Sequence, residues 1–238
     1  MNYAWEWLAD GVTRARLPFL DVTVGLVWNR TGAVLIDTGT TLTEARAIRA
    51  DVEALAGREV SHIVLTHSHF DHVLGASQFD GAAVYCAPAA AATMVDEPGL
   101  LRADAVRHGA DPHDVDEAIA ALRPPQHRVS SAVIELGDRE VVVSHPGRGH
   151  TDHDLIAVVT GAERTVVFCG DLVEESGDPC IGADSDPAAW PATMDRLLEV
   201  GGDDAVYVPG HGALVDARFV RRQRRWLAGN VTKFRPPM

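Results

Sequence analysis

Three histidines and one aspartate stand within six residues of this chain: His67, His69, Asp71 and His72. Imidazole and carboxylate groups suit zinc, iron or manganese, and the absence of clustered cysteines argues against a structural thiolate site. In a loop, the first two histidines can face one metal ion while the aspartate and the third histidine face a second. Six residues cannot complete two such sites, so the sequence predicts further ligands elsewhere.

Three later turns offer the missing ligands. They are Pro146-Gly-Arg-Gly-His150, Cys169-Gly-Asp171 and Val208-Pro-Gly-His-Gly212, and each follows an expected strand. Glycine lets the backbone bend tightly and come close to a ligand. The first cluster also follows an apolar run, residues 60–65. We therefore expect four strand ends to converge on one metal site.

The elements that must position these residues follow from hydrophobic periodicity. Thr41 or Thr43 is expected to begin a helix over 43–56, and Gly57 to end it. Further helices are expected at about 73–79, 187–200 and 216–228, with an Ala-rich helical insert at about 88–123. Strands are expected at 21–28, 33–37, 60–65, 82–86, 129–136, 140–144, 155–160, 165–169 and 205–208. This order predicts one domain over residues 1–238, in which two sheets lie between outer helices.

Composition narrows the partners and the compartment. The chain has 238 residues and a formal net charge of −13, which disfavours nucleic acid as a partner. Its start lacks the basic and apolar regions of a signal peptide, and no apolar run is long enough to span a membrane. The three cysteines (Cys86, Cys169 and Cys180) show no C-x-x-C spacing and fit reduced thiols. We therefore expect a cytoplasmic protein that acts on a small molecule and not on nucleic acid or membrane.

Together with the early Leu35-Ile-Asp-Thr-Gly39, these motifs resemble the metallo-β-lactamase superfamily from about residue 20 to residue 215. The resemblance implies an α/β fold of four layers, an αβ/βα sandwich in which two mixed β-sheets are flanked by helices. It assigns one metal ion to His67, His69 and His150, and the other to Asp71, His72 and His211. It places Asp171 between the two ions and Asp37 behind the ligands, where its carboxylate orients them.

The implied cofactor is a pair of zinc ions, with iron or manganese possible, and the implied nucleophile is a hydroxide shared by the two ions. Asp71 and Asp171 would take part in catalysis through the metals. His153, three residues after His150, is a candidate hydrogen-bond or proton donor to the substrate; the alternative is an ordinary loop histidine.

The ligand set resembles the glyoxalase II and lactonase branches, which share a bridging aspartate. It therefore implies hydrolysis of an ester, thioester or lactone carbonyl. β-Lactam hydrolysis is an alternative that Asp171 and the missing export signal disfavour. A glutathione thioester would need a basic cluster, which a chain almost without lysine supplies poorly. An iron-dependent sulfur dioxygenase and a non-catalytic metal-binding protein are further alternatives, disfavoured because all seven ligands are present.

Three segments are expected to decide specificity: a loop at 14–20, the insert at 88–123 and the segment 174–190. The small and apolar residues of the insert suggest a lid that favours an uncharged or apolar acyl group. The arginines at 218, 221, 222, 224 and 225 alternate with apolar residues on one expected helix, so we interpret them as a solvated helix face. The sequence leaves the substrate and the oligomeric state open.

Overall fold

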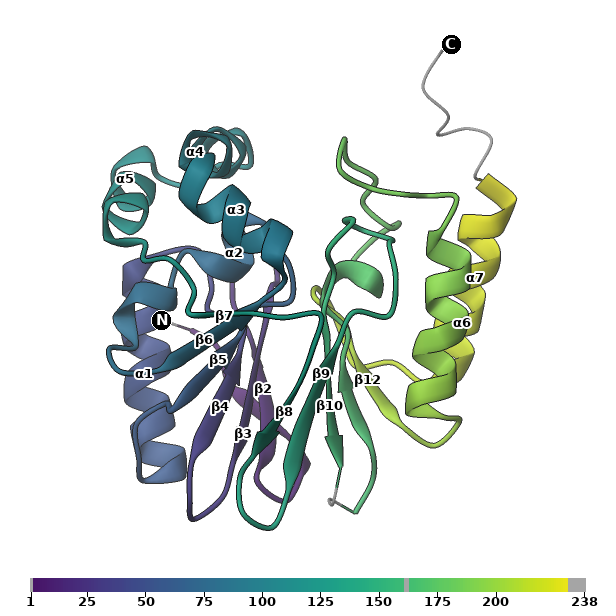
Figure 1. Cartoon of the computed structure of the whole chain (residues 1–238), viewed down its shortest axis with the longest axis horizontal. Helices are drawn as coiled ribbons and strands as arrows, with labels where there is room; N and C mark the ends of the chain where they lie inside the picture. Colours follow the sequence, from purple (N-terminus) through teal and green to yellow (C-terminus); the bar gives the residue numbers. More distant parts are fainter. Residues whose placement is uncertain (1, 161–162, 231–238) are drawn as a thin grey trace.

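The computed structural model describes residues 2–160 and 163–230. Two β-sheets form the centre of the molecule, with helices on the outer face of each (Figure 1). Helix α1 lies along the outer side of the first sheet, α3 to α5 lie above the upper end of its strands in this view, and α6 and α7 cover the second sheet. This is the four-layer sandwich that the sequence predicts.

The first sheet has seven strands in chain order: β1 (Trp5–Ala9), β2 (Val12–Arg16), β3 (Thr23–Trp28), β4 (Ala33–Ile36), β5 (His62–Val64), β6 (Ala83–Cys86) and β7 (His127–Arg128). Strands β1 to β4 pair antiparallel, and β4 to β7 pair parallel. The sheet is therefore mixed, as expected.

The second sheet has five strands in the order β12 (Val206–Val208), β11 (Val166–Phe168), β10 (Ile156–Thr160), β9 (Glu140–Ser144) and β8 (Ser131–Glu135). Only the pairing of β11 with β12 is parallel. The carboxyl ends of parallel strands lie at the same edge of a sheet, and this holds for β4 to β7 in the first sheet and for β11 and β12 in the second.

The helices are α1 (Leu42–Ala56), α2 (Phe70–Val73), α3 (Pro88–Asp96), α4 (Pro98–Arg107), α5 (Pro112–Ala121), α6 (Trp190–Gly201) and α7 (Ala217–Asn230). Thr41 caps α1 in a capping box with Glu44, and Gly57 ends it in the left-handed conformation, at a φ of 65°. Helices α3, α4 and α5 each begin with proline, which suits the first helical turn. In the described part of the chain, no helix has the length and apolar character needed to cross a membrane.

The structure corrects two sequence-based expectations. Strands β1 and β2 were not predicted, and residues 14–16 belong to β2 instead of a loop. The sequence of β2 does not alternate between apolar and polar residues, because the charged residue Arg14 occupies a buried position. The second correction concerns the histidine-rich run of residues 67–72: Asp71 and His72 lie in α2, which begins at Phe70, earlier than the helix expected at 73–79.

The two sheets meet where Gly25 of β3 faces Phe168 of β11. A methyl group on Gly25 would lie 2.3 Å from Cε1 of the Phe168 ring, well inside van der Waals contact. Phe168 is buried in the core. It is the last residue of β11 and stands three residues before Asp171. The absence of a side chain at residue 25 therefore helps to set the position of the loop that carries Asp171.

We expect Gly25→Ala to lower the free energy of unfolding by about 1–3 kcal/mol, because the core around Phe168 has no room for the added methyl group. Gly99→Ala is the matched control: it lies in α4, and beyond its own neighbours in the helix no atom lies within 4 Å of the added carbon. That substitution should be neutral or stabilise the protein by up to about 1 kcal/mol. Urea unfolding measures both, and equal effects would contradict the packing argument.

Candidate metal centre

The structure brings all seven expected ligands together at one end of the sheets. One group consists of His67, His69, His150 and Asp171, and a second of Asp71, His72 and His211. Within each group, one candidate ligand atom per residue lies within 4.8 Å of the others, and all the side chains except that of His69 are buried. The first cluster follows the end of β5, and the three later motifs follow the ends of β9, β11 and β12, as the sequence predicts.

Asp171 lies between the two groups. Its Oδ2 atom is 3.4 Å from Nε2 of His150 in the first group and 3.3 Å from Nε2 of His211 in the second. Its Oδ1 atom is 3.2 Å from Nε2 of His72 and has no hydrogen bond in the described structure. Asp171 therefore has the position of a carboxylate that two metal ions can share.

Two of the histidines donate their outer N–H to backbone carbonyls. His150 Nδ1 lies 3.1 Å from the carbonyl oxygen of Cys180, and His211 Nδ1 lies 2.8 Å from that of Leu20. Because a carbonyl only accepts, both rings must carry the proton on Nδ1. Their Nε2 atoms are then free to offer a lone pair to a metal ion.

Two more histidines donate to carboxylates. His72 Nδ1 lies 2.8 Å from Oδ2 of Asp37, the carboxylate expected behind the ligands. His69 Nε2 lies 2.9 Å from Oδ2 of Asp184. Each carboxylate fixes the tautomer of its histidine, so His72 presents Nε2 and His69 presents Nδ1 toward the centre.

His67 follows the same rule through a hydroxyl group. Thr66 Oγ1 donates to Asp37 Oδ2 at 2.8 Å, so it accepts from Nδ1 of His67 at 3.0 Å. The remaining nitrogen, Nε2 of His67, is buried and has no hydrogen-bond partner in the described structure. An unpaired buried acceptor is costly, and it points to a missing partner.

The inward nitrogens face one another across the centre. His69 Nδ1 lies 2.9 Å from His150 Nε2, and His72 Nε2 lies 3.4 Å from His211 Nε2. If their outer nitrogens alone carry protons, each pair brings two lone pairs together, and the contact is repulsive unless a proton or a metal ion lies between the two nitrogens. The donor set therefore fits two metal ions, and imidazole with carboxylate is the chemistry that zinc accepts.

The pKa shifts agree with this fit. Burial lowers the pKa of His150 to about 4, so this ring is neutral and available as a ligand. Burial also opposes protonation of His211, but the carboxylates of Asp171 and Asp71 outweigh it and raise its pKa to about 10. The same carboxylates raise the pKa of His72 well above its ordinary value against the effect of burial. The second group thus attracts a cation, which is a proton in the metal-free protein and which a bound metal ion would displace.

A family model described as the metallo-beta-lactamase superfamily matches residues 17–211. The chain belongs to the metallo-β-lactamase superfamily. Members of this superfamily are metal-dependent hydrolases, and so is this chain. The match covers both halves of the molecule and all seven residues of the centre.

Curated relatives in the superfamily are moderately similar. The human acyl-coenzyme A thioesterase MBLAC2 is 29% identical over 228 residues, which cover 88% of this chain and 81% of that protein. Rat metallo-beta-lactamase domain-containing protein 1 is 30% identical over 191 residues, which cover 76% of this chain. The matched part spans only 62% of the rat protein's length.

Solved structures of the superfamily share the fold. The metallo-beta-lactamase FIM-1 from Pseudomonas aeruginosa, in its mono-zinc form, has a TM-score of 0.72 and 18% identity, with 97% of each chain covered. A metallo-beta-lactamase from Hirschia baltica has a TM-score of 0.69 and 16% identity, with both chains fully covered. At these identities the likeness concerns the fold alone.

Two acidic residues at this superfamily centre were missed by the sequence analysis. Glu174 is buried, and its carboxylate forms a further candidate ligand group with Asp171 and His211. Burial, and then the nearby Asp171 carboxylate, raises the pKa of Glu174 to about 7. The other is Asp184, the partner of His69. Both lie in the segment expected to decide specificity, but no motif distinguishes them from its other acidic residues.

His153 does not join the ligand groups. Its Nε2 atom lies 3.0 Å from Ser68 Oγ, and its Nδ1 atom lies 2.8 Å from Oδ1 of Asp152. Both ring nitrogens are thus engaged by protein groups, and the ring is 8% exposed. A role in donating a proton to the substrate stays a prediction.

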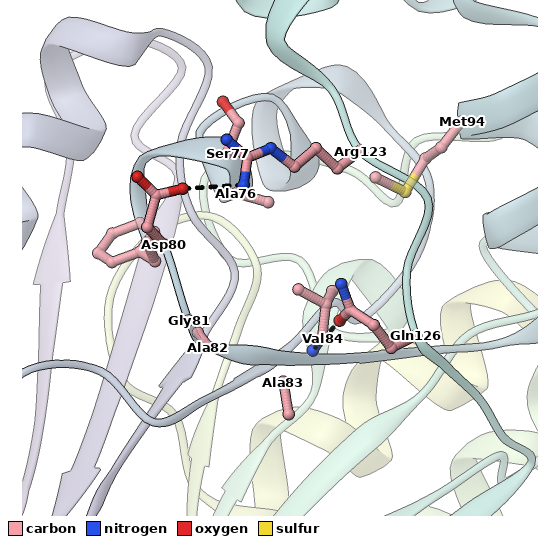
Figure 2. Close-up of a pocket in the computed structure, with 11 residues that line it drawn as sticks. Ala76, Ser77, Asp80, Gly81, Ala82, Ala83, Val84, Met94, Arg123 and Gln126 are labelled. Carbon is pink, nitrogen blue, oxygen red and sulfur yellow. Dashed lines mark hydrogen bonds and ion pairs between the residues drawn. The ribbon is translucent and has the colours of Figure 1, made fainter.

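A cavity of about 300 Å³ lies away from the centre, and none of the seven ligand residues lines it. Figure 2 shows the Arg123 side chain reaching across it toward Asp80, with Met94 on one side and Gln126 below. The two charged groups form an ion pair at 2.9 Å. The cavity is therefore separate from the site where the histidines converge.

The low pKa of His150 leads to a prediction for the metal-free protein. In the unfolded chain this histidine titrates near pH 6.5, and in the folded chain near pH 4. The unfolded state therefore binds an extra proton between these values, and the contribution of His150 to stability falls as the pH falls through this window. The loss should be on the order of 3 kcal/mol.

Urea unfolding of the metal-free wild type and of His150→Gln, at several pH values from about 7 to about 4, measures this contribution. Because glutamine does not titrate, the wild type should lose more unfolding free energy than His150→Gln as the pH falls. A difference that stays constant over this range would contradict the assignment of a neutral, buried His150.

Proposed function

We propose that this protein is a two-zinc hydrolase of small molecules that cleaves an ester, thioester or lactone carbonyl, with thioesters of uncharged acyl groups as the first candidates. The single observation that carries the proposal is the convergence of five imidazole nitrogens and two carboxylates on two adjacent points, with Asp171 between them. Zinc would be held by His67, His69 and His150 at one point, by Asp71, His72 and His211 at the other, and by Asp171 at both.

A zinc pair bound here would lower the pKa of a water molecule and stabilise negative charge on the substrate oxygen. The chain's own residues hold the geometry that this chemistry needs. Asp37 accepts from His72, from the Thr66 hydroxyl and from the Thr66 backbone N–H at 2.8 Å, so one buried carboxylate orients a histidine in each group. Asp37 therefore links His72 of the second group with Thr66, the partner of His67 in the first.

The bond class is supported by a relative. The human protein MBLAC2 is named an acyl-coenzyme A thioesterase, and this chain covers 81% of its length. A bridging aspartate in the centre fits the same class, as the sequence analysis argues. The proposed bond is therefore a thioester, and the surroundings of the centre bear on the acyl group.

These surroundings are acidic. Cys180 is exposed beside the centre, and after burial the largest influences that raise its pKa are the carboxylates of Asp171, Glu174 and Asp104. Asp104 belongs to α4, so the helical insert reaches toward the centre from the first half of the chain. Bound zinc would offset the charge of Asp171 and Glu174, so these carboxylates alone do not decide the charge of the acyl group. The proposed preference for uncharged acyl groups therefore rests on the small and apolar residues of the insert.

A substrate panel tests the proposal. We expect zinc-loaded protein to hydrolyse short apolar acyl thioesters with a kcat/KM at least tenfold above that for matched acyl groups ending in a carboxylate. Lactone and β-lactam arms of the same panel should show weaker hydrolysis. Rates are followed by the absorbance of a thiol reagent and by substrate absorbance.

Asp171→Ala is the control, because it removes the carboxylate shared by both groups. We expect it to lose more than a hundredfold in kcat/KM. Asp178→Ala, which removes an exposed carboxylate from the nearby loop, should retain wild-type rates. Full hydrolysis by the Asp171→Ala variant, or a preference for β-lactams over all thioesters, would overturn the proposal.

A further inference from the structure

The first ligand group depends on a segment that has no regular secondary structure. Residues 176–189 connect the Asp171 loop to α6 and contain neither helix nor strand. Asp184 of this segment accepts from Nε2 of His69, and the carbonyl of Cys180 accepts from Nδ1 of His150. The outer partners of two of the three histidines in the first group therefore come from one exposed stretch of chain.

Further bonds attach the same segment to the His150 turn. The hydroxyl of Ser185 donates to the carbonyl oxygen of His150 at 2.6 Å, and it accepts from the backbone N–H of Gly182 at 2.9 Å. The backbone N–H of Asp186 donates to the carbonyl of Gly149 at 2.9 Å. The segment is thus attached to the centre mainly through residues that hold the first group.

The second ligand group is supported differently. His72 is oriented by Asp37, which is 2% exposed and directly follows β4. His211 is oriented by the carbonyl of Leu20 in the turn between β2 and β3. These partners belong to the first sheet and its tight turns, whereas the Asp184 side chain is 43% exposed and that of His69 is 26% exposed.

We propose that Asp184 is a positioning residue for His69. Changes in the 176–189 segment would then alter zinc affinity at the first group and leave zinc affinity at the second group unchanged. The inference rests on the proposed function only in that zinc is the ligand. An oriented imidazole presents its lone pair without loss of rotational freedom, and loss of such an outer partner costs about 10–100-fold in metal affinity. Zinc at the first group should in turn hold the segment in place, since linkage is reciprocal.

The test is a calorimetric zinc titration of chelator-treated, full-length protein. Asp184→Ala should weaken one of two zinc-binding events by about 10–100-fold and leave the other within about twofold. Asp184→Asn keeps an oxygen that can accept from His69, so it should recover much of the lost affinity. Asp178→Ala is the matched control: its side chain makes no hydrogen bond or ion pair with any other described residue, and both zinc affinities should be unchanged.

Hydrogen exchange of the 176–189 amides gives a readout that does not depend on activity. In the wild type, zinc binding at the first group should slow this exchange; in Asp184→Ala the exchange should stay fast at the same zinc concentration. The melting temperature of metal-free Asp184→Ala should match that of the metal-free wild type, which separates positioning from a general loss of structure.

Equal weakening of both binding events, unchanged affinities in Asp184→Ala, or the same loss in Asp178→Ala would each overturn the inference. Failure of the proposed function has a different signature. In that case the wild type itself would bind no zinc pair or would hydrolyse no member of the ester, thioester and lactone panel.

Discussion

The orientation of five imidazole rings is the constraint on which the site depends. Each ring has one nitrogen bonded to a protein group outside the centre, and each presents its other nitrogen inward. The outer partner determines which nitrogen of each ring carries the proton. This partner is a backbone carbonyl, a carboxylate, or a hydroxyl that donates its own hydrogen to another group. The result is a buried set of lone pairs and two central carboxylates, which is unfavourable without cations and favourable with them.

The fold supplies these outer partners at two levels of rigidity. Sheet ends and the buried Asp37 hold His67, His72 and His211, and Gly25 and Phe168 are in close contact where the two sheets meet. The 176–189 segment holds the other two histidines from the surface side. The same centre thus combines a rigid half with a half that loop sequence can change, which is how one superfamily fold can serve different substrates.

Much of this was predictable from the sequence, because the ligand motifs follow apolar strands and carry their own glycine turns. The helix of residues 42–56 was predictable from its cap and its periodicity. Strands β1 and β2 were not, since an alternation that includes a buried Arg14 resembles a polar loop. Glu174 and Asp184 could not be distinguished either, because their roles come from contacts with residues far away in the chain, and single acidic residues in a loop carry no periodic signal.

The central claim is that the chain holds two metal ions between its two ligand groups. Elemental analysis of protein purified without added metal, after dialysis against metal-free buffer, tests it most directly. We expect about two zinc ions per wild-type chain, and one or none per chain in Asp171→Ala. A single iron ion per wild-type chain would contradict it and would favour the oxygenase alternative over hydrolysis.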